Sequence, residues 1–156
     1  MRRIFRRVAI ALVAFLGLAQ LVRVERTNPP VAGEVPAPLE VQVMLRQACY
    51  DCHSNETVWP WYSQVAPISW LLAYDVGEGR KELNFSTWQQ YKQKAQRKKL
   101  KETVETVNEG EMPPWYYVLV HPEARLADVD RQALVAWAGQ AGDSASLPAL
   151  SGSPRR

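Results

Sequence analysis

Apolar residues in the middle of the chain recur every three or four positions, which is the spacing of a helix with one buried face. The first such stripe predicts a helix that runs directly into the cysteines. Its members are Val41, Leu45, Ala48 and Cys52. A second stripe begins behind Pro67, a residue suited to the first turn of a helix, and we expect this helix to end at Gly77 and Gly79.

The pattern continues through the second half of the chain. Ser86 and Gln89 have the spacing of a capping box and predict another helix start. Two further stripes predict a short helix that ends at Gly110 and a last helix after the turn at His121 and Pro122. Their members are Leu100, Val104 and Val107, then Val129, Ala133 and Trp137. Long alternating runs of apolar and polar residues are absent, so the predicted fold class is all-α, with one helical domain at residues 39–138.

Residues 1–26 carry a different pattern. Four arginines within the first seven residues precede an apolar run over residues 8–22, which only Gln20 interrupts. Basic residues before an apolar run hold the N-terminus in the cytoplasm and direct the following chain across the membrane. We expect a retained transmembrane helix and a single-pass protein of a bacterial cytoplasmic membrane, with its domain facing the periplasm. A signal peptide cleaved near residues 17–19 is the alternative.

The segments on either side of the domain have the composition of a linker and a tail. Four prolines in residues 27–38 favour an extended spacer, and the small, polar residues 139–156 predict a disordered tail. Residues 1–26 hold six arginines and one glutamate, whereas the rest of the chain holds 13 basic and 15 acidic residues. The positive charge therefore belongs to the targeting segment and does not indicate a nucleic-acid partner.

The only two cysteines, Cys49 and Cys52, are followed at once by His53. This C-x-x-C-H pattern is typical of covalent haem attachment, in which each thiol adds to a haem vinyl group and the histidine binds the iron. We expect one covalently bound haem c per chain. A zinc site that adds His121 as a fourth ligand, or a redox dithiol, are the alternatives.

Aromatic residues are frequent, and the sequence PWY occurs twice. Flat rings pack well on a flat macrocycle, so we expect some of these rings to line the haem pocket, although ordinary core packing is the alternative for any one of them. The candidates are Trp59, Trp61, Tyr62, Trp70, Trp115 and Tyr116.

A sixth iron ligand is expected from a thioether or an imidazole. Met112 lies between the helix end at Gly110 and two prolines that stiffen the chain, and it is our preferred ligand. Met44 lies on the first predicted helix and is expected in the core. His121 as the ligand, or an open iron site, are the alternatives.

The chain resembles the small membrane-anchored haem-binding domains related to c-type cytochromes. The resemblance covers about residues 24–138 and rests on the stretches ERTNPPV, CYDCHSNETVWPWYSQVAPISWLL, VGEGRKELNFSTW, GEMPPWYYVLVHPEA and ALVAWA. It implies a cytochrome c-like helical domain, with His53 as proximal and Met112 as distal ligand and with Cys49 and Cys52 as attachment points. Ala127 departs from the Ser or Asp expected before the last helix.

Two functions remain open. A membrane-tethered one-electron carrier, rather than an enzyme, fits two strong axial ligands, whereas a haem-based sensor or small oxidative enzyme needs an open or displaceable site. A carrier implies a redox partner protein. The basic run KQKAQRKKLK is either a solvated helix surface or a docking patch for such a partner or for an anionic membrane.

Overall fold

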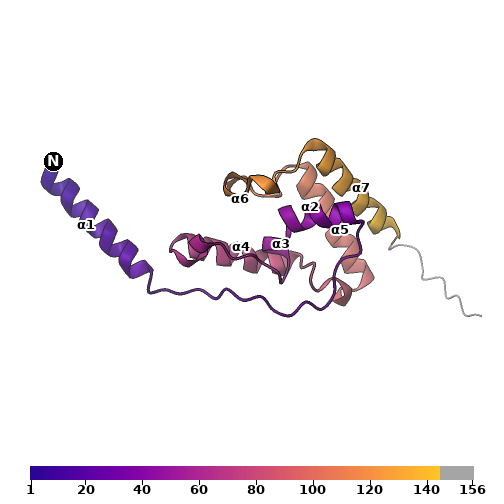
Figure 1. Cartoon of the computed structure of the whole chain (residues 1–156), viewed down its shortest axis with the longest axis horizontal. Helices are drawn as coiled ribbons and strands as arrows, with labels where there is room; N and C mark the ends of the chain where they lie inside the picture. Colours follow the sequence, from indigo (N-terminus) through magenta and orange to yellow (C-terminus); the bar gives the residue numbers. More distant parts are fainter. Residues whose placement is uncertain (145–156) are drawn as a thin grey trace, which may run out of the picture.

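The computed structural model describes residues 1–144 of the 156-residue chain (Figure 1). This part of the chain is all-α, with seven α-helices and no β-strand, which confirms the predicted class. The α-helices are α1 (Arg2–Ala19), α2 (Leu39–Ala48), α3 (Tyr50–His53), α4 (Ile68–Glu82), α5 (Gln93–Asn108), α6 (Trp115–Val120) and α7 (Asp128–Ser144). Short 3-10 helices lie between them: η1 (Trp61–Gln64), η2 (Trp88–Gln90) and η3 (Pro122–Ala124).

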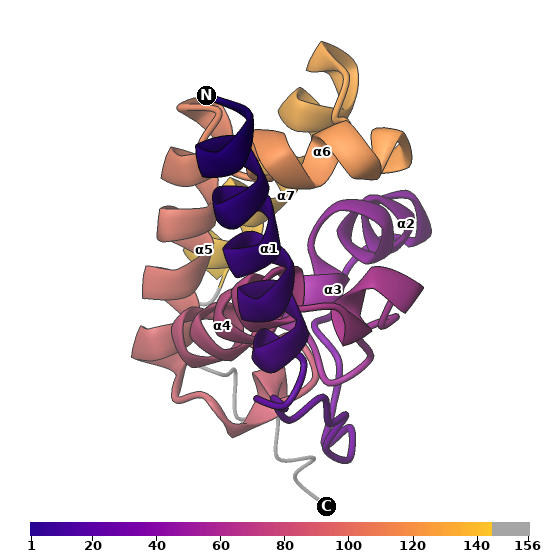
Figure 2. The same cartoon turned by 90° about the vertical axis from the view of Figure 1, so that its left-hand side faces the viewer.

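The core lies where α2, α5 and α7 meet, with α5 packed along α7 (Figures 1 and 2). Leu45, Leu100 and Leu134 come from these three helices and are almost completely buried. Phe85, which is also almost completely buried, joins them from the loop after α4 and stacks on Tyr50 with ring centroids 5.4 Å apart. Burial of these side chains holds the cysteine-bearing segment against the long helices.

The predicted first helix is interrupted at the first cysteine. Cys49 has φ −127° and ψ −36°, so α2 ends before it and the single turn of α3 begins after it. The amide of His53 still donates to the Cys49 carbonyl at 2.8 Å. The predicted helix therefore reaches the cysteine motif but bends at Cys49, and the rest of the motif lies on the single turn of α3.

The predicted end of the next helix at Gly77 and Gly79 is wrong, because α4 continues to Glu82. Gly79 serves packing instead of helix termination. A Cβ atom at this position would lie 2.6 Å from the Cys52 carbonyl oxygen, so the missing side chain lets α4 approach α3 closely.

The predicted capping box at Ser86 is also wrong. Ser86 is fully buried, and its hydroxyl oxygen accepts the Asn55 amide at 2.9 Å. The side-chain amide of Asn84 donates to Asn55 Oδ1 at 2.8 Å. These bonds tie the loop after the cysteine motif to residues 84–86, and α5 starts only at Gln93.

Residues 27–38 do not form a free spacer. They are extended, but hydrogen bonds hold them along the domain: Arg80 donates to the Thr27 carbonyl at 2.8 Å, and the Asn55 side chain donates to the Pro30 carbonyl at 2.9 Å. Val35 is buried in the core. The segment is therefore part of the folded unit, because its carbonyl groups find donors on the domain surface.

The last helix departs from expectation at its end. It runs to Ser144, so residues 139–144 are helical, while the rest of the predicted tail, residues 145–156, lies outside the described residues. At its start, the Asp130 carboxylate accepts the Ala127 amide at 3.2 Å. This bond supplies a cap that the Ala127 side chain cannot provide.

The N-terminal segment forms α1, where we predicted a retained transmembrane helix within residues 1–26. Over residues 1–144, no helix combines the length and the apolar character needed to cross a membrane. The transmembrane part of the prediction is therefore not confirmed.

Candidate haem site

A cavity of about 340 Å³ brings together three of the predicted site residues, Cys49, His53 and Met112. Cys49 and Met112 are 63 positions apart along the chain. The packing of α3 and α5 against the end of α4 makes them neighbours. The other apolar residues of the wall are Ala48, Leu83, Phe85, Val107 and Pro113. The polar residues of the wall are Glu82, Lys99, Glu102, Thr103 and Thr106.

The imidazole of His53 is oriented by the end of α4. Its Nδ1 lies 2.9 Å from the Gly79 carbonyl oxygen and 3.0 Å from the Leu83 carbonyl oxygen. A carbonyl can only accept, so Nδ1 carries the proton and donates it. The lone pair of Nε2 is then free to bind a metal, as is usual for histidine ligands held by a backbone carbonyl.

The surroundings of His53 also favour the neutral ring. Burial lowers the pKa of His53, and the nearby Lys99 lowers it further. The two carbonyl acceptors raise the pKa, but burial outweighs them. A neutral imidazole is the form that ligates iron. The proton on Nδ1 and the lowered pKa thus both favour the form of His53 that a metal ligand requires.

The two thiols are free and partly buried. Burial raises the pKa of Cys49 to about 12, and the neighbouring Cys52 contributes in the same direction. Burial raises the pKa of Cys52 to about 12 as well, with smaller contributions from Asp75 and Asp51. Reactive dithiols have depressed pKa values, so this environment argues against the redox-dithiol alternative.

The zinc alternative finds no support in the geometry. Within residues 1–144, no group of three or more His, Cys, Asp or Glu side chains is placed to hold a metal ion. His121 does not line the cavity of His53. Its Nε2 accepts the Tyr62 hydroxyl at 2.6 Å, and its Nδ1 donates to Glu123 at 3.2 Å.

Met112 reaches the cavity because α5 ends sharply. Gly110 has φ +74°, a conformation that favours glycine, and turns the chain back toward the helix. The amides of Glu111 and Met112 then donate to the Thr106 carbonyl at 3.0 and 3.2 Å. The Met112 side chain is 37% exposed, so it lies at the mouth of the cavity rather than deep within it.

Residues 14–140 match the family described as haem-binding domain. The chain belongs to this family. No curated protein and no solved structure matches it. The match spans most of the chain and includes every residue of the cavity, which agrees with the donor set found there: a thiol, an oriented imidazole and a thioether around an apolar space.

The predicted aromatic residues lie elsewhere in this haem-binding domain. None of the six lines the cavity of His53 and Met112. Trp59, Tyr62 and Tyr116 line a second cavity of about 220 Å³, while Trp61 and Trp115 are largely exposed. The indole of Trp70 donates to the Val22 carbonyl at 3.1 Å.

Tyrosines of α6 fasten the segment that follows Met112. The Tyr117 hydroxyl donates to Asp51 of α3 at 2.8 Å, and the Tyr116 hydroxyl donates to Asp75 of α4 at 3.1 Å. Tyr117 also stacks on His121, with ring centroids 4.4 Å apart. Helix α6, which follows the Met112 loop, is thereby linked to α3 of the cysteine motif and to α4.

The basic run on α5 divides between surface and site. Lys98 and Lys101 form exposed pairs with Glu102 and Glu105, which is typical of a solvated helix. Lys99 lines the cavity, donates to the Glu82 carbonyl and lies 4.7 Å from the Tyr91 ring centroid. It places a cation at the wall of the cavity that His53 and Met112 line.

Sequence reasoning missed several residues of this site. The carbonyl groups of Gly79 and Leu83 orient His53, but a backbone acceptor leaves no signature in the residue type. Thr103 and Thr106 lie within the predicted helix, but its apolar period does not show which of its polar residues face a cavity. Helix α6 was not predicted at all, since its six residues are too short to show a helical period.

Proposed function

We propose that this chain is a c-type haem protein that carries single electrons, with haem joined to Cys49 and Cys52 and with His53 and Met112 as axial ligands. The observation that carries the proposal is the shared cavity of Cys49, His53 and Met112. Membership of the haem-binding domain family supports the cofactor, and the C-x-x-C-H spacing supports its covalent attachment.

The residues around the cavity have separate tasks in this proposal. The two carbonyl groups at the end of α4 hold the His53 ring in one orientation. Leu83, Phe85 and Val107 supply apolar walls that limit the access of water. A haem iron held by imidazole and thioether supplies reversible one-electron chemistry, and a His/Met pair raises its reduction potential.

A sensor or small oxidative enzyme is the second candidate. One observation favours it: the Met112 side chain is more than a third exposed, so its thioether is less firmly enclosed than a buried ligand. A displaceable thioether leaves a position for an external ligand. Carbon monoxide separates the two candidates, because it binds ferrous haem only where a coordination position is free.

We expect the wild-type protein to bind little carbon monoxide at neutral pH and to show the weak far-red absorption band of a sulfur–iron bond. Met112→Ala is expected to remove this band, to admit carbon monoxide fully and to lower the reduction potential. Absorption spectroscopy of the full-length holoprotein, with and without carbon monoxide, measures the first two effects, and a redox titration followed by absorbance measures the reduction potential.

The matched control is Met44→Leu, because Met44 is buried on α2 in the core and its replacement conserves volume. His121→Ala is a second control, since His121 lies in the other cavity. Both are expected to keep the wild-type spectrum. A wild-type protein that already binds carbon monoxide fully, with a spectrum that Met112→Ala leaves unchanged, would favour the sensor or enzyme.

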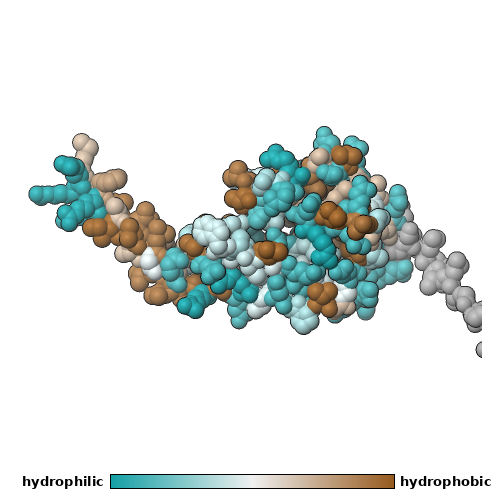
Figure 3. Space-filling view, in the orientation of Figure 1, coloured by the Kyte–Doolittle hydropathy of each residue, from teal (hydrophilic) through white to brown (hydrophobic). Residues whose placement is uncertain are grey.

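We also propose that α1 attaches the domain to a bacterial cytoplasmic membrane, with the haem site on the periplasmic side. The apolar side chains of α1 are exposed along the helix, and its arginines gather at the N-terminal end (Figure 3). The full chain is expected to stay in the membrane fraction after washes with high salt. A soluble protein that begins near Gln20 would show cleavage and contradict this proposal.

A carrier on a membrane requires a redox partner protein. The exposed lysines of α5 are our candidate for its docking surface, because positive charge accelerates association with an acidic partner.

A further inference from the structure

Helix α1 is connected to the domain by specific hydrogen bonds at its C-terminal end. The Gln20 side chain donates to the Ala66 carbonyl at 3.1 Å and accepts the Ala66 amide at 3.0 Å. The Trp70 indole donates to the Val22 carbonyl at 3.1 Å. These bonds hold the junction of η1 and α4 beside the end of α1. Any surface into which α1 inserts therefore lies close to the junction of η1 and α4.

The same end of the domain exposes large apolar side chains from η1, the start of α4 and α6. We call them the apolar face: Trp61, Val65, Ile68, Leu71, Trp115 and Leu119. Trp61 is 76% exposed, Trp115 77% and Leu119 71%. Figure 1 shows α6 and the beginning of α4 at the end nearest α1, and Figure 3 shows hydrophobic atoms at α6 and along α1.

One cavity confirms that these elements are neighbours. Ile68 and Leu71 of α4 line it together with Tyr116 and Val120 of α6. The start of α4 and helix α6 therefore border one region of the surface, and η1 packs against α4. The exposed side chains of the apolar face are carried by these adjacent elements, and exposed apolar surface gathered in this way marks an interaction site.

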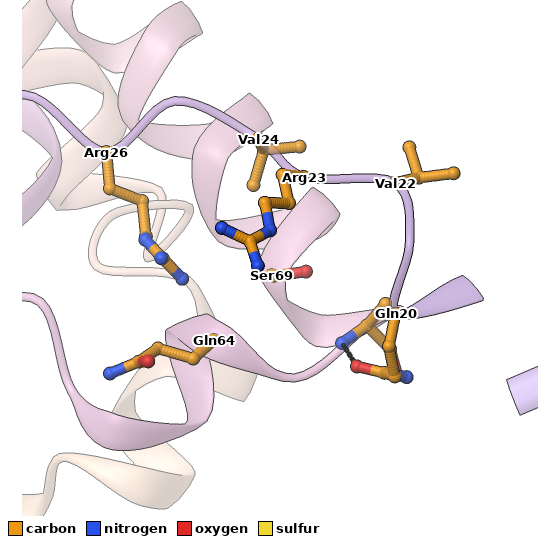
Figure 4. Close-up of a pocket in the computed structure, with 8 residues that line it drawn as sticks. Gln20, Val22, Arg23, Val24, Arg26, Gln64 and Ser69 are labelled. Carbon is orange, nitrogen blue, oxygen red and sulfur yellow. Dashed lines mark hydrogen bonds between the residues drawn. The ribbon is translucent and has the colours of Figure 1, made fainter. Parts of the chain in front are cut away.

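A basic pocket of about 240 Å³ lies next to this face, at the root of α1. Arg23 and Arg26 line it together with Gln64 and Ser69, and Figure 4 shows Arg26 extending toward Gln64. The Arg26 guanidinium donates to the Ser63 carbonyl at 2.6 Å, which fixes it above η1. Guanidinium groups held in this way suit phosphate oxygens.

Two carboxylates that line the cavity between α4 and α6 accept hydrogen bonds from α6. Asp51 accepts the Tyr117 hydroxyl, and Asp75 accepts the Tyr116 hydroxyl. Indole rings beside arginines are the combination that settles at the boundary between lipid headgroups and acyl chains. Continuity with α1, which is itself apolar and exposed, selects a lipid bilayer as the occupant over a partner protein.

We infer that the apolar face rests on an anionic lipid bilayer, with Trp61 and Trp115 at the headgroup boundary and with Arg23 and Arg26 against lipid phosphates. The inference rests on the proposed attachment of α1 and deepens it: the domain lies on the membrane instead of standing away from it. The haem site then keeps a fixed orientation to the bilayer.

Hydrogen–deuterium exchange of the full-length holoprotein in lipid nanodiscs tests the inference. In discs that contain phosphatidylglycerol, amides of residues 61–71 and 115–120 are expected to exchange at least about tenfold more slowly in wild type than in Trp61→Gln/Trp115→Gln. The control Leu39→Gln/Val129→Gln replaces exposed apolar residues of α2 and α7 and is expected to match wild type. Arg23→Gln is expected to reduce the protection to the level found in phosphatidylcholine discs.

Equal exchange in wild type and in the tryptophan variant would overturn the inference. Protection that appears only when two chains share a disc would also overturn it, because a second copy would then cover the face. Protection that is the same in both lipids would overturn the role of the arginines. All variants are expected to keep the wild-type haem spectrum and to sediment with membranes. A wild-type protein that shows no haem spectrum, or that does not sediment with membranes, would instead contradict the proposed function.

Discussion

A chain in which both Cys49 and Cys52 are replaced by alanine is expected to hold no covalent haem. The two sulfurs are the only thiols of the sequence, so no other side chain can form a thioether with the macrocycle. Wild-type protein made in a host that matures c-type cytochromes is expected to stay coloured after denaturation and extraction with acidified organic solvent. The double variant is expected to lose all its colour to the organic phase.

The single variants Cys49→Ala and Cys52→Ala are the matched controls, since each leaves one thiol and is expected to retain part of the haem covalently. The double variant should also melt at a lower temperature, because a ligand bound to the native state contributes to its stability. Complete extraction of haem from the wild-type protein would disprove covalent attachment while leaving haem binding itself intact.

Gly79→Ala is expected to lower the free energy of unfolding by about 3 kcal/mol. The added methyl carbon would lie 2.6 Å from the carbonyl oxygen of Cys52 and 3.1 Å from its carbonyl carbon. Both are backbone atoms that cannot rotate away, so α4 must move off α3. This movement also withdraws the Gly79 and Leu83 carbonyls from His53, and we expect a disturbed haem spectrum as a second effect.

Gly77→Ala is the matched control, because Gly77 lies on the same helix and a Cβ there meets nothing within 4 Å. This change is expected to raise stability by up to about 1 kcal/mol, since alanine favours the helix. Chemical denaturation of the full-length holoprotein in detergent compares the two. If both variants unfold at the same denaturant concentration, the close approach of α4 to the cysteine motif is wrong.

The haem-binding family was readable in the sequence because its motif consists of neighbouring residues. C-x-x-C-H is a local pattern, and it predicted the haem-binding family that the match over residues 14–140 confirms. The all-α class was readable for a related reason: helical periodicity is a property of a short stretch of chain. Met112 was singled out by its place between Gly110 and two prolines, and the structure places it in the cavity of His53.

Tertiary structure decided what depends on residues distant in sequence. Gly79 looked like a helix end, but it is the contact point of two helices, and only their packing shows this. The prolines of residues 27–38 correctly indicated an extended segment. They did not show that Arg80 and Asn55 donate hydrogen bonds to its carbonyl groups and hold it along the domain. Some of the conspicuous aromatic residues were expected in the haem pocket, but Trp61 and Trp115 lie on the surface. The sequence by itself thus determined the haem-binding family and the class of fold, since both follow from local spacing. The orientation of His53 and the surface beside α1 arise from contacts that exist only after the helices pack.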